Sequence, residues 1–353
     1  MSRTILIMGG GTGGHIFPGL SVADVLKRRG WKVVWMGNPE GMEGRIVPAH
    51  GDPMAPLRFS GVRGKGVLRK LALPVSLFSA CRQAGNEIRR FRPNVVLGMG
   101  GYASFPGGAM AVLKGCPLVI HEQNSVAGLA NRVLAKFATR VLTGFPKVLP
   151  KKGEWVGNPI RSEIARLAGL EKRYAERDSR LRLLVLGGSL GAFAINEVIP
   201  EGIGLLAEDE RPFIVHQSGE NHLEKLKENY EAAGVQATCV AFIDDMAGAY
   251  EWADLVLCRA GALTIAELSA VGVASILVPF PQAVDDHQTL NAKFLSMTGG
   301  AVLLPQEKMR PESIRLIRNY TRSQLAQMAE KANLQAKPDA AERVADICEE
   351  CAR

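Results

Sequence analysis

Short runs of apolar residues recur along the chain, and each is followed by glycine or polar residues and then by a stretch with helical periodicity. Such runs between turn-forming residues are typical of buried strands, and their alternation with helical stretches is typical of a parallel sheet. In the first half, strands are predicted at 5–8, 32–36, 95–97, 118–120 and 141–143. In the second half, they are predicted at 183–186, 213–216, 239–242, 255–258 and 275–278.

The same alternation in both halves predicts two doubly wound α/β domains. Helices are expected at 18–29, which Gly30 would end, and at 67–90. The stretch at 146–159 is predicted to be a linker between the halves, and the charged residues at 166–182 a solvated helix or loop. Further helices are predicted at 311–320, 323–336 and 340–352.

The stretch at 6–19, LIMGGGTGGHIFPG, places five glycines within six positions, between a predicted strand and a helix whose first turn suits Pro18. Glycine has no Cβ, so the N–H groups at such a helix start can approach phosphate or developing negative charge closely. His15 follows the glycines, and an unperturbed imidazole titrates near neutral pH. The stretch therefore predicts an anion-binding loop with a residue that could take or hold a proton.

The spacing G-x-G-x-x-G at 9–14 also fits a dinucleotide-binding loop. A nicotinamide site would need an acidic residue at the end of the second strand to bind the ribose. The strand at 32–36 runs into Gly and Asn instead, and Glu40 and Glu43 come later, in a loop. The spacing of the acids therefore disfavours an oxidoreductase.

Two more loops of the first half follow predicted strands directly. GMGGY at 98–102 follows one strand, and HEQN at 121–124 follows the next. Polar residues just beyond the carboxyl ends of strands lie where open α/β sheets bind ligands. With the glycine loop, they predict one cleft in this half.

The densest motif of the second half is CRAGALTIAE at 258–267, where a strand ends, Gly261 turns the chain and a helix begins. The N–H groups of such a helix start suit phosphate. Glu267 lies one turn inside the helix, where its carboxylate could accept hydrogen bonds from two ribose hydroxyls. The spacing Thr264-x-x-Glu267 also fits a capping box, in which the glutamate only satisfies a backbone N–H. The residues alone leave both interpretations open.

The chain has 353 residues, 47% hydrophobic and 22% charged, which is ordinary for a soluble protein with two cores. No apolar run approaches the roughly 20 residues of a membrane span, and the N-terminus lacks the apolar core of a signal peptide, so we expect a cytoplasmic protein. The six cysteines form no disulfide framework and no ligand cluster with the histidines, and Cys348-x-x-Cys351 is expected on a helix surface. We expect reduced thiols, no metal and no cofactor.

The net charge of +8 is concentrated at 58–92, which holds nine basic residues and one acid, Glu87. This segment is either a helix with a solvated charged rim, or an apolar patch ringed by cations that rests on an anionic lipid surface, where each cation contributes about 1 kcal/mol. A nucleic-acid-binding module would also explain the charge, but the segment has few aromatic residues to stack on bases. The lipid-facing patch would comprise Lys65, Leu68, Arg69, Lys70, Leu71, Val75, Phe78 and Arg82.

Eight motifs cover nearly the whole chain in order: GGGTGGH at 9–15, GMGGY at 98–102, HEQN at 121–124, GNPIR at 157–161, GGSLGA at 187–192, FIDDM at 242–246, RAGALTIAE at 259–267 and DDHQTLNA at 285–292. Taken together, they resemble those of the MurG family, the bacterial family 28 transferases that add N-acetylglucosamine to undecaprenyl-pyrophosphoryl-N-acetylmuramoyl-pentapeptide. Leu190 stands where many members have glutamine, which leaves only its backbone N–H for a contact.

The resemblance implies a GT-B fold of two Rossmann-like domains facing a central cleft. Residues 1–157 would bind the lipid acceptor and the membrane, residues 158–339 would bind UDP-N-acetylglucosamine, and the helix at about 340–353 would pack back on the first domain. The resemblance also favours the lipid interpretation of the basic patch. It implies a peripheral protein on the cytoplasmic face of the bacterial cell membrane, which acts in cell-wall synthesis and division and could contact other proteins of those processes.

Position by position, the resemblance implies that Ile243 meets the uracil through its backbone beside Phe242, and that Glu267 binds the ribose. The diphosphate would be held by Arg161, Ser189 and the turn of Ala262, Leu263, Thr264, Ile265 and Ala266. The sugar hydroxyls would be reached by Asn124, Gln288 and Asn291. Across the cleft from them would lie Thr12, Gly13 and Gly14.

The donor sugar is α-linked and the implied product is a β-1,4 disaccharide, so the acceptor 4-hydroxyl should displace UDP in one inverting step. This step needs a base and a means of stabilising the leaving diphosphate. His15 is the leading candidate base, although its imidazole could instead only hydrogen-bond to the acceptor or diphosphate; Glu122 and Tyr102 are the other candidates. No Asp-x-Asp motif adjoins the phosphate loop, so magnesium should be dispensable. The rival enzyme of similar fold is a UDP-N-acetylglucosamine 2-epimerase, which the basic apolar patch disfavours.

Overall fold

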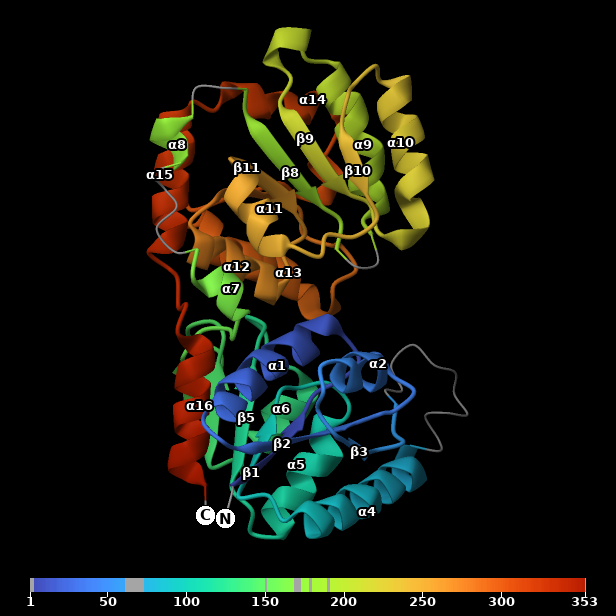
Figure 1. Cartoon of the computed structure of the whole chain (residues 1–353), viewed down its shortest axis with the longest axis vertical. Coiled ribbons are helices and arrows are strands. Elements are labelled where there is room, and N and C mark those ends of the chain that lie inside the picture. Colours follow the sequence, from blue (N-terminus) through green and yellow to red (C-terminus); the bar gives the residue numbers. More distant parts are fainter. Residues whose placement is uncertain are drawn as a thin grey trace. The chain divides into compact units, whose positions relative to one another are not determined.

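The computed structural model describes residues 3–60, 73–149, 151–167, 173–177, 180–188 and 191–352. The chain divides into two compact units (Figure 1): unit 1 comprises Met1–Arg161 and Pro338–Arg353, and unit 2 comprises Ser162–Lys337. Each unit contains one parallel sheet with helices packed on it. This architecture confirms the predicted α/β class with two doubly wound sheets.

The described residues of unit 1 form a seven-stranded parallel sheet in the order β3-β2-β1-β4-β5-β6-β7. Helices cover both faces of the sheet, so nearly every residue of its central strands is buried. This burial on both faces explains why the strands appear in the sequence as unbroken apolar runs. Its strands are β1 (Thr4–Met8), β2 (Lys32–Gly37), β3 (Met54–Pro56), β4 (Val95–Gly98), β5 (Leu118–Glu122), β6 (Arg140–Thr143) and β7 (Gly153–Trp155).

Alternate residues of β1 face two different cores, as the two-residue repeat of a strand requires. Ile5 and Ile7 pack against α1 and α16, whereas Leu6 and Met8 pack against α4, α5 and α6. The helices of unit 1 are α1 (Gly13–Arg28), α2 (Met42–Ala49), α4 (Leu73–Phe91), α5 (Ser104–Leu113), α6 (Leu129–Leu134) and α16 (Ala340–Cys351).

The C-terminal helix α16 packs against α1. The guanidinium of Arg29, which follows α1, forms ion pairs with Glu342, Asp346 and Glu349 at 2.7–2.8 Å. Cys348 lies on the buried face of α16 and is 0% exposed, so its predicted place on a helix surface is wrong. The amphipathic repeat of α16 turns this cysteine toward the core, where it acts as a small apolar side chain.

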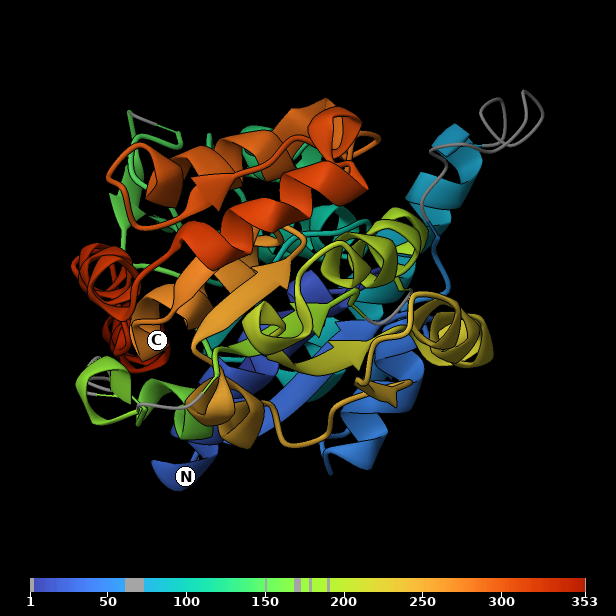
Figure 2. The same cartoon turned by 90° about the horizontal axis from the view of Figure 1, so that it is seen from above.

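The described residues of unit 2 form a six-stranded parallel sheet in the order β10-β9-β8-β11-β12-β13. One face packs on α9, α10 and α15 around a core that includes Leu183, Val185 and Leu255. Figure 2 shows the helices of this unit on both sides of its strands. The strands are β8 (Arg182–Leu186), β9 (Phe213–Gln217), β10 (Thr238–Val240), β11 (Leu255–Cys258), β12 (Ala274–Leu277) and β13 (Val302–Leu303). The helices are α7 (Ser162–Ala165), α8 (Arg173–Glu176), α9 (Phe193–Gly204), α10 (Leu223–Ala232), α11 (Met246–Trp252), α12 (Ala262–Val271), α13 (His287–Ser296), α14 (Pro311–Ile314) and α15 (Arg322–Asn333).

Several predicted boundaries are wrong. Helix α1 begins at Gly13 rather than at Pro18, so the last two glycines of the loop belong to its first turn. The predicted linker at 146–159 contains the edge strand β7, and the predicted helix at 311–320 is α14 followed by a 3₁₀ helix, Arg315–Asn319. The short strands β3 and β13 were also missed, because two or three residues give too little periodicity to detect.

The charged stretch at 166–182 was expected to be a solvated helix or loop, but one of its charged side chains is buried. Arg173 is 5% exposed, and its guanidinium donates hydrogen bonds to the backbone carbonyls of Tyr250 and Ala253. Both carbonyls lie at the carboxyl end of α11, in its last turn and at its C-cap residue, so the arginine supplies donors to helix-end carbonyls. The charge repeat alone does not distinguish such a buried arginine from a surface one.

Candidate functional site

The glycine loop of unit 1 leaves the carboxyl end of β1, beside which the strand order reverses between β1 and β4. Gly11 has φ of +87°, a conformation that favours glycine. Thr12 is the N-cap residue of α1, and its carbonyl accepts hydrogen bonds from the N–H groups of His15 and Ile16. The structure thus places Thr12, Gly13 and Gly14 at the start of a helix, where backbone N–H groups attract anions.

Glu43 of α2 lies under the glycine loop and is completely buried. Its carboxylate accepts hydrogen bonds from the N–H groups of Gly11 and Asn38, at 3.1 and 3.0 Å, and from the hydroxyl of Tyr102 at 2.7 Å. A buried carboxylate is stable only where such donors surround it, and in return it fixes the loop that carries them. This role was not predicted, because the position of Glu43 in the sequence indicates only an acidic residue in a loop.

Tyr102, a candidate base, is held by this carboxylate. Burial raises the pKa of Tyr102 well above its usual value, and the hydrogen bond to Glu43 raises it further. The phenol therefore stays protonated near neutral pH and donates to Glu43. These contacts favour a structural role for Tyr102 in the loop.

His15, the leading candidate base, is half-buried in the first turn of α1. Hydrogen bonds connect it to Gln123, which directly follows β5, and through Gln123 to His121 within β5. Nδ1 of His15 lies 2.9 Å from Oε1 of Gln123, and Nε2 of Gln123 lies 3.1 Å from Nδ1 of His121. Nε2 of His121 lies 2.8 Å from the carbonyl oxygen of Gly157. His121 is completely buried, and this burial lowers its pKa to about 4. Neither Gln123 nor His121 was singled out from the sequence as a site residue.

Glu122, another candidate base, has its carboxylate occupied by the loop after β5. One oxygen accepts from the N–H of Asn124 at 3.1 Å, and the other accepts from the N–H of Gly128 at 3.0 Å and from the amide of Asn131 at 2.9 Å. The side chain is 2% exposed. These bonds favour a structural role, in which Glu122 shapes the loop that presents Asn124.

In unit 2, the strand order reverses between β8 and β11, and α12 begins just after β11. The N-cap residue of α12 is Gly261, and the first helical bond runs from the N–H of Ile265 to its carbonyl. Thr264 therefore lies inside the helix, and the capping-box interpretation does not hold. Glu267 is 6% exposed and accepts a hydrogen bond from the hydroxyl of Tyr250 at 2.9 Å.

The other residues predicted to contact the sugar nucleotide lie in the first turns of α13, which holds Gln288 and Asn291, and in the loop after β10, which holds Phe242 and Ile243. The amide of Asn291 is buried and donates to the carbonyl of Ala260, and Gln288 accepts from the N–H of Phe280. Phe242 is 54% exposed after β10, followed by the half-buried Ile243. Ser189 and Leu190 lie outside the described residues. The structure thus brings the 242–243, 260–267 and 288–291 segments to the carboxyl ends of parallel strands.

Arg161 is half-buried at the end of the first segment of unit 1, three residues after the buried Asn158, whose amide donates to the carbonyl of Gln123. This bond ties the GNPIR motif to the loop after β5. As for metals, no group of three or more His, Cys, Asp or Glu side chains in the described ranges is placed to hold an ion.

The lipid-facing patch expected on unit 1 is described only in part. Val75 and Phe78 of α4 are both 74% exposed, and with the exposed Arg82 they lie on one side of the helix. Leu113, which ends the neighbouring helix α5, is 76% exposed and was not predicted. Five predicted members lie outside the described residues: Lys65, Leu68, Arg69, Lys70 and Leu71. Among the described helices, none combines the length and apolar character needed to cross a bilayer.

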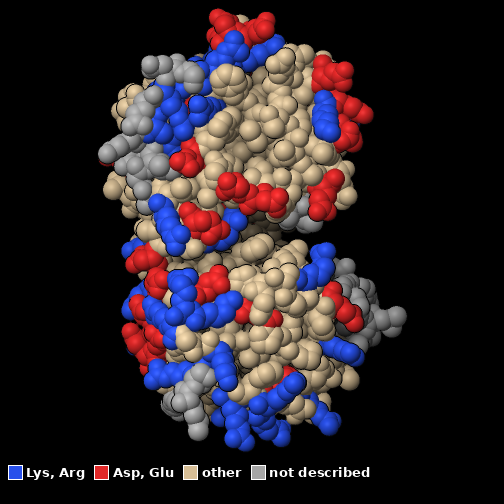
Figure 3. Space-filling view, viewed as in Figure 1, with Lys and Arg blue, Asp and Glu red and all other residues tan. Residues whose placement is uncertain are grey.

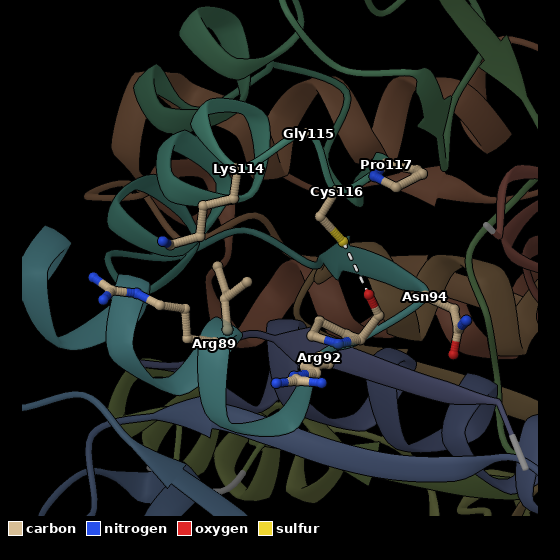
Figure 4. A pocket seen from close by; sticks show the side chains of 9 residues that line it. Arg89, Arg92, Asn94, Lys114, Gly115, Cys116 and Pro117 are labelled. Atoms are coloured by element: carbon tan, nitrogen blue, oxygen red, sulfur yellow. Dashed lines mark hydrogen bonds between the residues drawn. The ribbon is translucent and has the colours of Figure 1, made fainter.

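A basic pocket of about 590 Å³ lies where α4 and α5 end (Figure 4). Arg89, Arg92 and Lys114 line it, with Ile88 and Pro117 among its apolar residues. Figure 4 shows the side chains of Arg89 and Lys114 extending toward the same side of the pocket, and Figure 3 shows Lys and Arg gathered over this end of unit 1. The pocket was not predicted, because Lys114 follows α5 and is distant in sequence from the basic segment.

The sequence matches known proteins over its full length. Residues 5–143 match the glycosyltransferase family 28 N-terminal domain, and residues 182–344 match the glycosyltransferase family 28 C-terminal domain. The chain is 66% identical to the UDP-N-acetylglucosamine–N-acetylmuramyl-(pentapeptide) pyrophosphoryl-undecaprenol N-acetylglucosamine transferase of Dechloromonas aromatica, over 100% of both chains. It is 58% identical to the transferase of the same name from Ralstonia nicotianae, over 100% of this chain and 98% of that one.

Solved structures are similar as well. MurG of Acinetobacter baumannii is 39% identical, with a TM-score of 0.87 over 99% of each chain. The UDP-N-acetylglucosamine 2-epimerase of Neisseria meningitidis, solved with UDP-N-acetylglucosamine, has a TM-score of 0.66 over 99% of this chain and 100% of that one. Its identity is 12%, so this likeness concerns the fold alone.

Replacing Glu43 with alanine should destabilise unit 1, because two backbone N–H groups and the Tyr102 hydroxyl would lose their acceptor. We expect the free energy of unfolding to fall by roughly 2–4 kcal/mol, measured by urea denaturation. The matched control is Glu40→Ala, which removes an exposed acid nearby and should change stability by less than about 0.5 kcal/mol. Equal effects of the two substitutions would contradict the assigned role of Glu43.

Proposed function

The chain belongs to glycosyltransferase family 28, as its motifs predicted, and we propose on this premise that it transfers N-acetylglucosamine from UDP-N-acetylglucosamine to undecaprenyl-pyrophosphoryl-N-acetylmuramoyl-pentapeptide. The observation that carries the proposal is the identity, over the full length, to transferases named for this reaction. The epimerase alternative has only the likeness in fold to support it.

Unit 2 is the proposed donor site. The start of α12 lies beside the reversal of strand order, where open α/β sheets bind ligands, and its N–H groups suit the diphosphate. Glu267 is buried one turn behind and is oriented by Tyr250, which suits a carboxylate that binds ribose hydroxyls. The uracil would meet the backbone of Ile243 beside Phe242. In this unit, Ser189, Gln288 and Asn291 would complete the contacts to the diphosphate and the sugar. The resemblance also implies donor contacts from Arg161 and Asn124, which belong to unit 1.

Unit 1 is the proposed acceptor site. Its glycine loop presents Thr12, Gly13 and Gly14 at the start of α1, with His15 on the same turn. Buried Glu43 holds the loop in place before a ligand arrives, so that its N–H groups need little rearrangement to stabilise negative charge.

The proposed reaction is a single displacement at the anomeric carbon. The acceptor 4-hydroxyl gives its proton to His15, its oxygen forms the new bond to that carbon, and the bond to the diphosphate breaks with its electron pair passing to UDP. Charge that develops on the diphosphate is stabilised by the α12 helix start and by Arg161. Glu122 and Tyr102 are occupied by structural hydrogen bonds, which favours His15 as the base.

The purified protein should convert labelled UDP-N-acetylglucosamine and the lipid-linked acceptor into the disaccharide product, with or without EDTA. His15→Gln should lower kcat by roughly 10²- to 10⁴-fold, because glutamine cannot accept the proton. The control is His50→Gln, which changes an exposed histidine of unit 1 outside the site. If His15→Gln kept the rate and its pH profile, the base assignment would be wrong, and if the wild type formed no product, the proposed reaction would fail.

Glu267→Gln should raise the KM for UDP-N-acetylglucosamine by roughly 10- to 100-fold, since a hydrogen bond to a charged group contributes about 1.5–3 kcal/mol. Glutamine still accepts a bond from Tyr250, so the fold should be retained. Glu251→Gln is the control, because Glu251 is an exposed acid on α11. Steady-state kinetics with varied donor separates KM from kcat, and an unchanged KM would exclude a ribose contact.

We also propose that unit 1 docks peripherally on an anionic membrane, on the cytoplasmic face, where the lipid acceptor is anchored. Val75, Phe78 and Leu113 expose apolar surface, and the basic pocket lies at the end of the same helix pair. Within the described part of the chain, none of the three cations that line the pocket forms an ion pair. The two helix ends that border it correspond to roughly half a negative charge each, which offsets only about one of the three positive charges.

Phe78→Asp should weaken binding to vesicles of phosphatidylglycerol and phosphatidylcholine by roughly tenfold or more, because burial of a phenylalanine contributes about 1.5–3 kcal/mol. Lys114→Glu should weaken it by a similar factor, since two charges are changed at about 1 kcal/mol each. Leu334→Asp, at a residue 75% exposed in unit 2, should leave binding unchanged. Sedimentation with vesicles measures the three affinities, and equal losses in all three would argue against this docking surface.

A further inference from the structure

We propose that Gln123 and His121 are positioning residues that set which nitrogen of His15 carries a proton. The chain of hydrogen bonds that begins at the Gly157 carbonyl holds neutral His15 with its proton on Nδ1 and leaves Nε2 as the proton acceptor. The inference rests on the proposed function for its catalytic meaning. The hydrogen-bond logic itself depends only on contacts within unit 1.

The chain of hydrogen bonds begins at a group that can only accept. Nε2 of His121 lies 2.8 Å from the carbonyl oxygen of Gly157, so this nitrogen must carry a proton and donate it. Burial lowers the pKa of His121 to about 4, so the ring is neutral near pH 7 and has a single N–H. Nδ1 of His121 is therefore an acceptor.

The orientation of the Gln123 amide follows. The group that lies 3.1 Å from Nδ1 of His121 must be the amide nitrogen, because that ring nitrogen needs a donor. The same nitrogen lies 3.2 Å from the backbone carbonyl of His121, a second acceptor. The amide oxygen is thus directed to the other side, where it lies 2.9 Å from Nδ1 of His15.

An amide oxygen accepts only, so Nδ1 of His15 must donate. The neutral ring then has its lone pair on Nε2. In water, a neutral imidazole side chain favours the opposite tautomer, with its proton on Nε2. The hydrogen bonds that run from Gly157 to His15 therefore reverse the tautomer preference of the free side chain. Gly100 lies against the Nδ1 edge of the ring and has φ of +90°; a Cβ there would come within 3.0 Å of Nδ1. The Nδ1 edge of the His15 ring therefore lies against the backbone of Gly100.

The arrangement suits a base in two ways. The acceptor hydroxyl proton passes to Nε2, and the hydroxyl oxygen uses the electron pair of its O–H bond to bond to the sugar carbon. At the same time the bond from that carbon to the diphosphate breaks, and its electron pair leaves with UDP. The imidazolium that results keeps its Nδ1–H on the Gln123 oxygen, and a hydrogen bond from a charged donor is stronger than one from a neutral donor. Gln123 therefore both sets the tautomer before the reaction and stabilises the charge after it.

The tautomer can be read directly by ¹⁵N NMR of the full chain labelled at histidine, without substrate, at a pH where His15 is neutral. The His15 signals are assigned by their absence from the His15→Gln spectrum. We expect an Nδ1 that carries a proton and an Nε2 that does not. A wild-type His15 with its proton on Nε2 would overturn the inference, whatever the activity of the enzyme.

Gln123→Met keeps the length of the side chain but removes the hydrogen bonds of the amide to both His15 and His121. We expect the Nε2–H form of His15 to gain population and kcat to fall roughly 10- to 100-fold, as for other groups that orient a reacting residue, with the KM for UDP-N-acetylglucosamine unchanged. Gln335→Met, in the other unit, is the control and should change neither. A Gln123→Met protein that keeps the wild-type tautomer would overturn the inference even if kcat fell.

A second variant covers the case in which Gln123→Met fails to fold. Gln123→Glu retains an oxygen that accepts from Nδ1 of His15, so the wild-type tautomer should persist, and loss of that tautomer in a folded Gln123→Glu protein would overturn the inference. The tautomer measurement tests the inference and the transfer assay tests the proposed function, so one can fail without the other. An inactive wild-type protein with the expected tautomer would contradict the proposed function alone.

Discussion

Reversal of strand order beside the first strand of each sheet is the constraint on which the site depends. In unit 1 the reversal lies between β1 and β4, and in unit 2 between β8 and β11. Connections on the two sides of such a point leave toward opposite faces of the sheet, so a crevice remains at its carboxyl edge. The glycine loop with His15 occupies that edge in unit 1, and the start of α12 occupies it in unit 2. The topology thereby brings a helix start with exposed N–H groups to the carboxyl edge of each sheet, and the local sequence needs only glycine at the turn.

The hydrogen bonds of the buried carboxylates near these edges indicate that these groups have structural roles. Glu43 and Glu122 each accept three hydrogen bonds, mainly from loop backbone, and a carboxylate so occupied is poorly placed to take a proton from a substrate. His15 differs, because it is only half-buried and its one described polar side-chain contact is through Nδ1. The acids stiffen the loops so that the imidazole and the backbone N–H groups stand in place before ligands bind.

The two parallel sheets, the glycine loop and the helix start after β11 were predictable from the sequence, since each depends on local periodicity and turn residues. The strands β3, β7 and β13 were not predicted, because they are too short to show a repeat, and α1 was predicted to begin at Pro18 although it begins at Gly13. The role of Glu43 could not be predicted either, because its partners come from three other segments of the chain. Long-range hydrogen bonds of this kind leave no spacing in the sequence that a local pattern could reveal.

The two buried histidines show why the end of a hydrogen-bond chain decides its chemistry. His216 in unit 2 is completely buried, which lowers its pKa to about 3, and it lies between Oδ1 of Asn196 and the hydroxyl of Tyr230. The Asn196 amide nitrogen donates to the carbonyl of Ser218, so here too one tautomer is set. That chain ends at Tyr230, which is 3% exposed in the core, so no ligand can exchange a proton with it. The chain from His121 ends instead at His15 beside the glycine loop, and the same arrangement there acts on a group that is only half-buried.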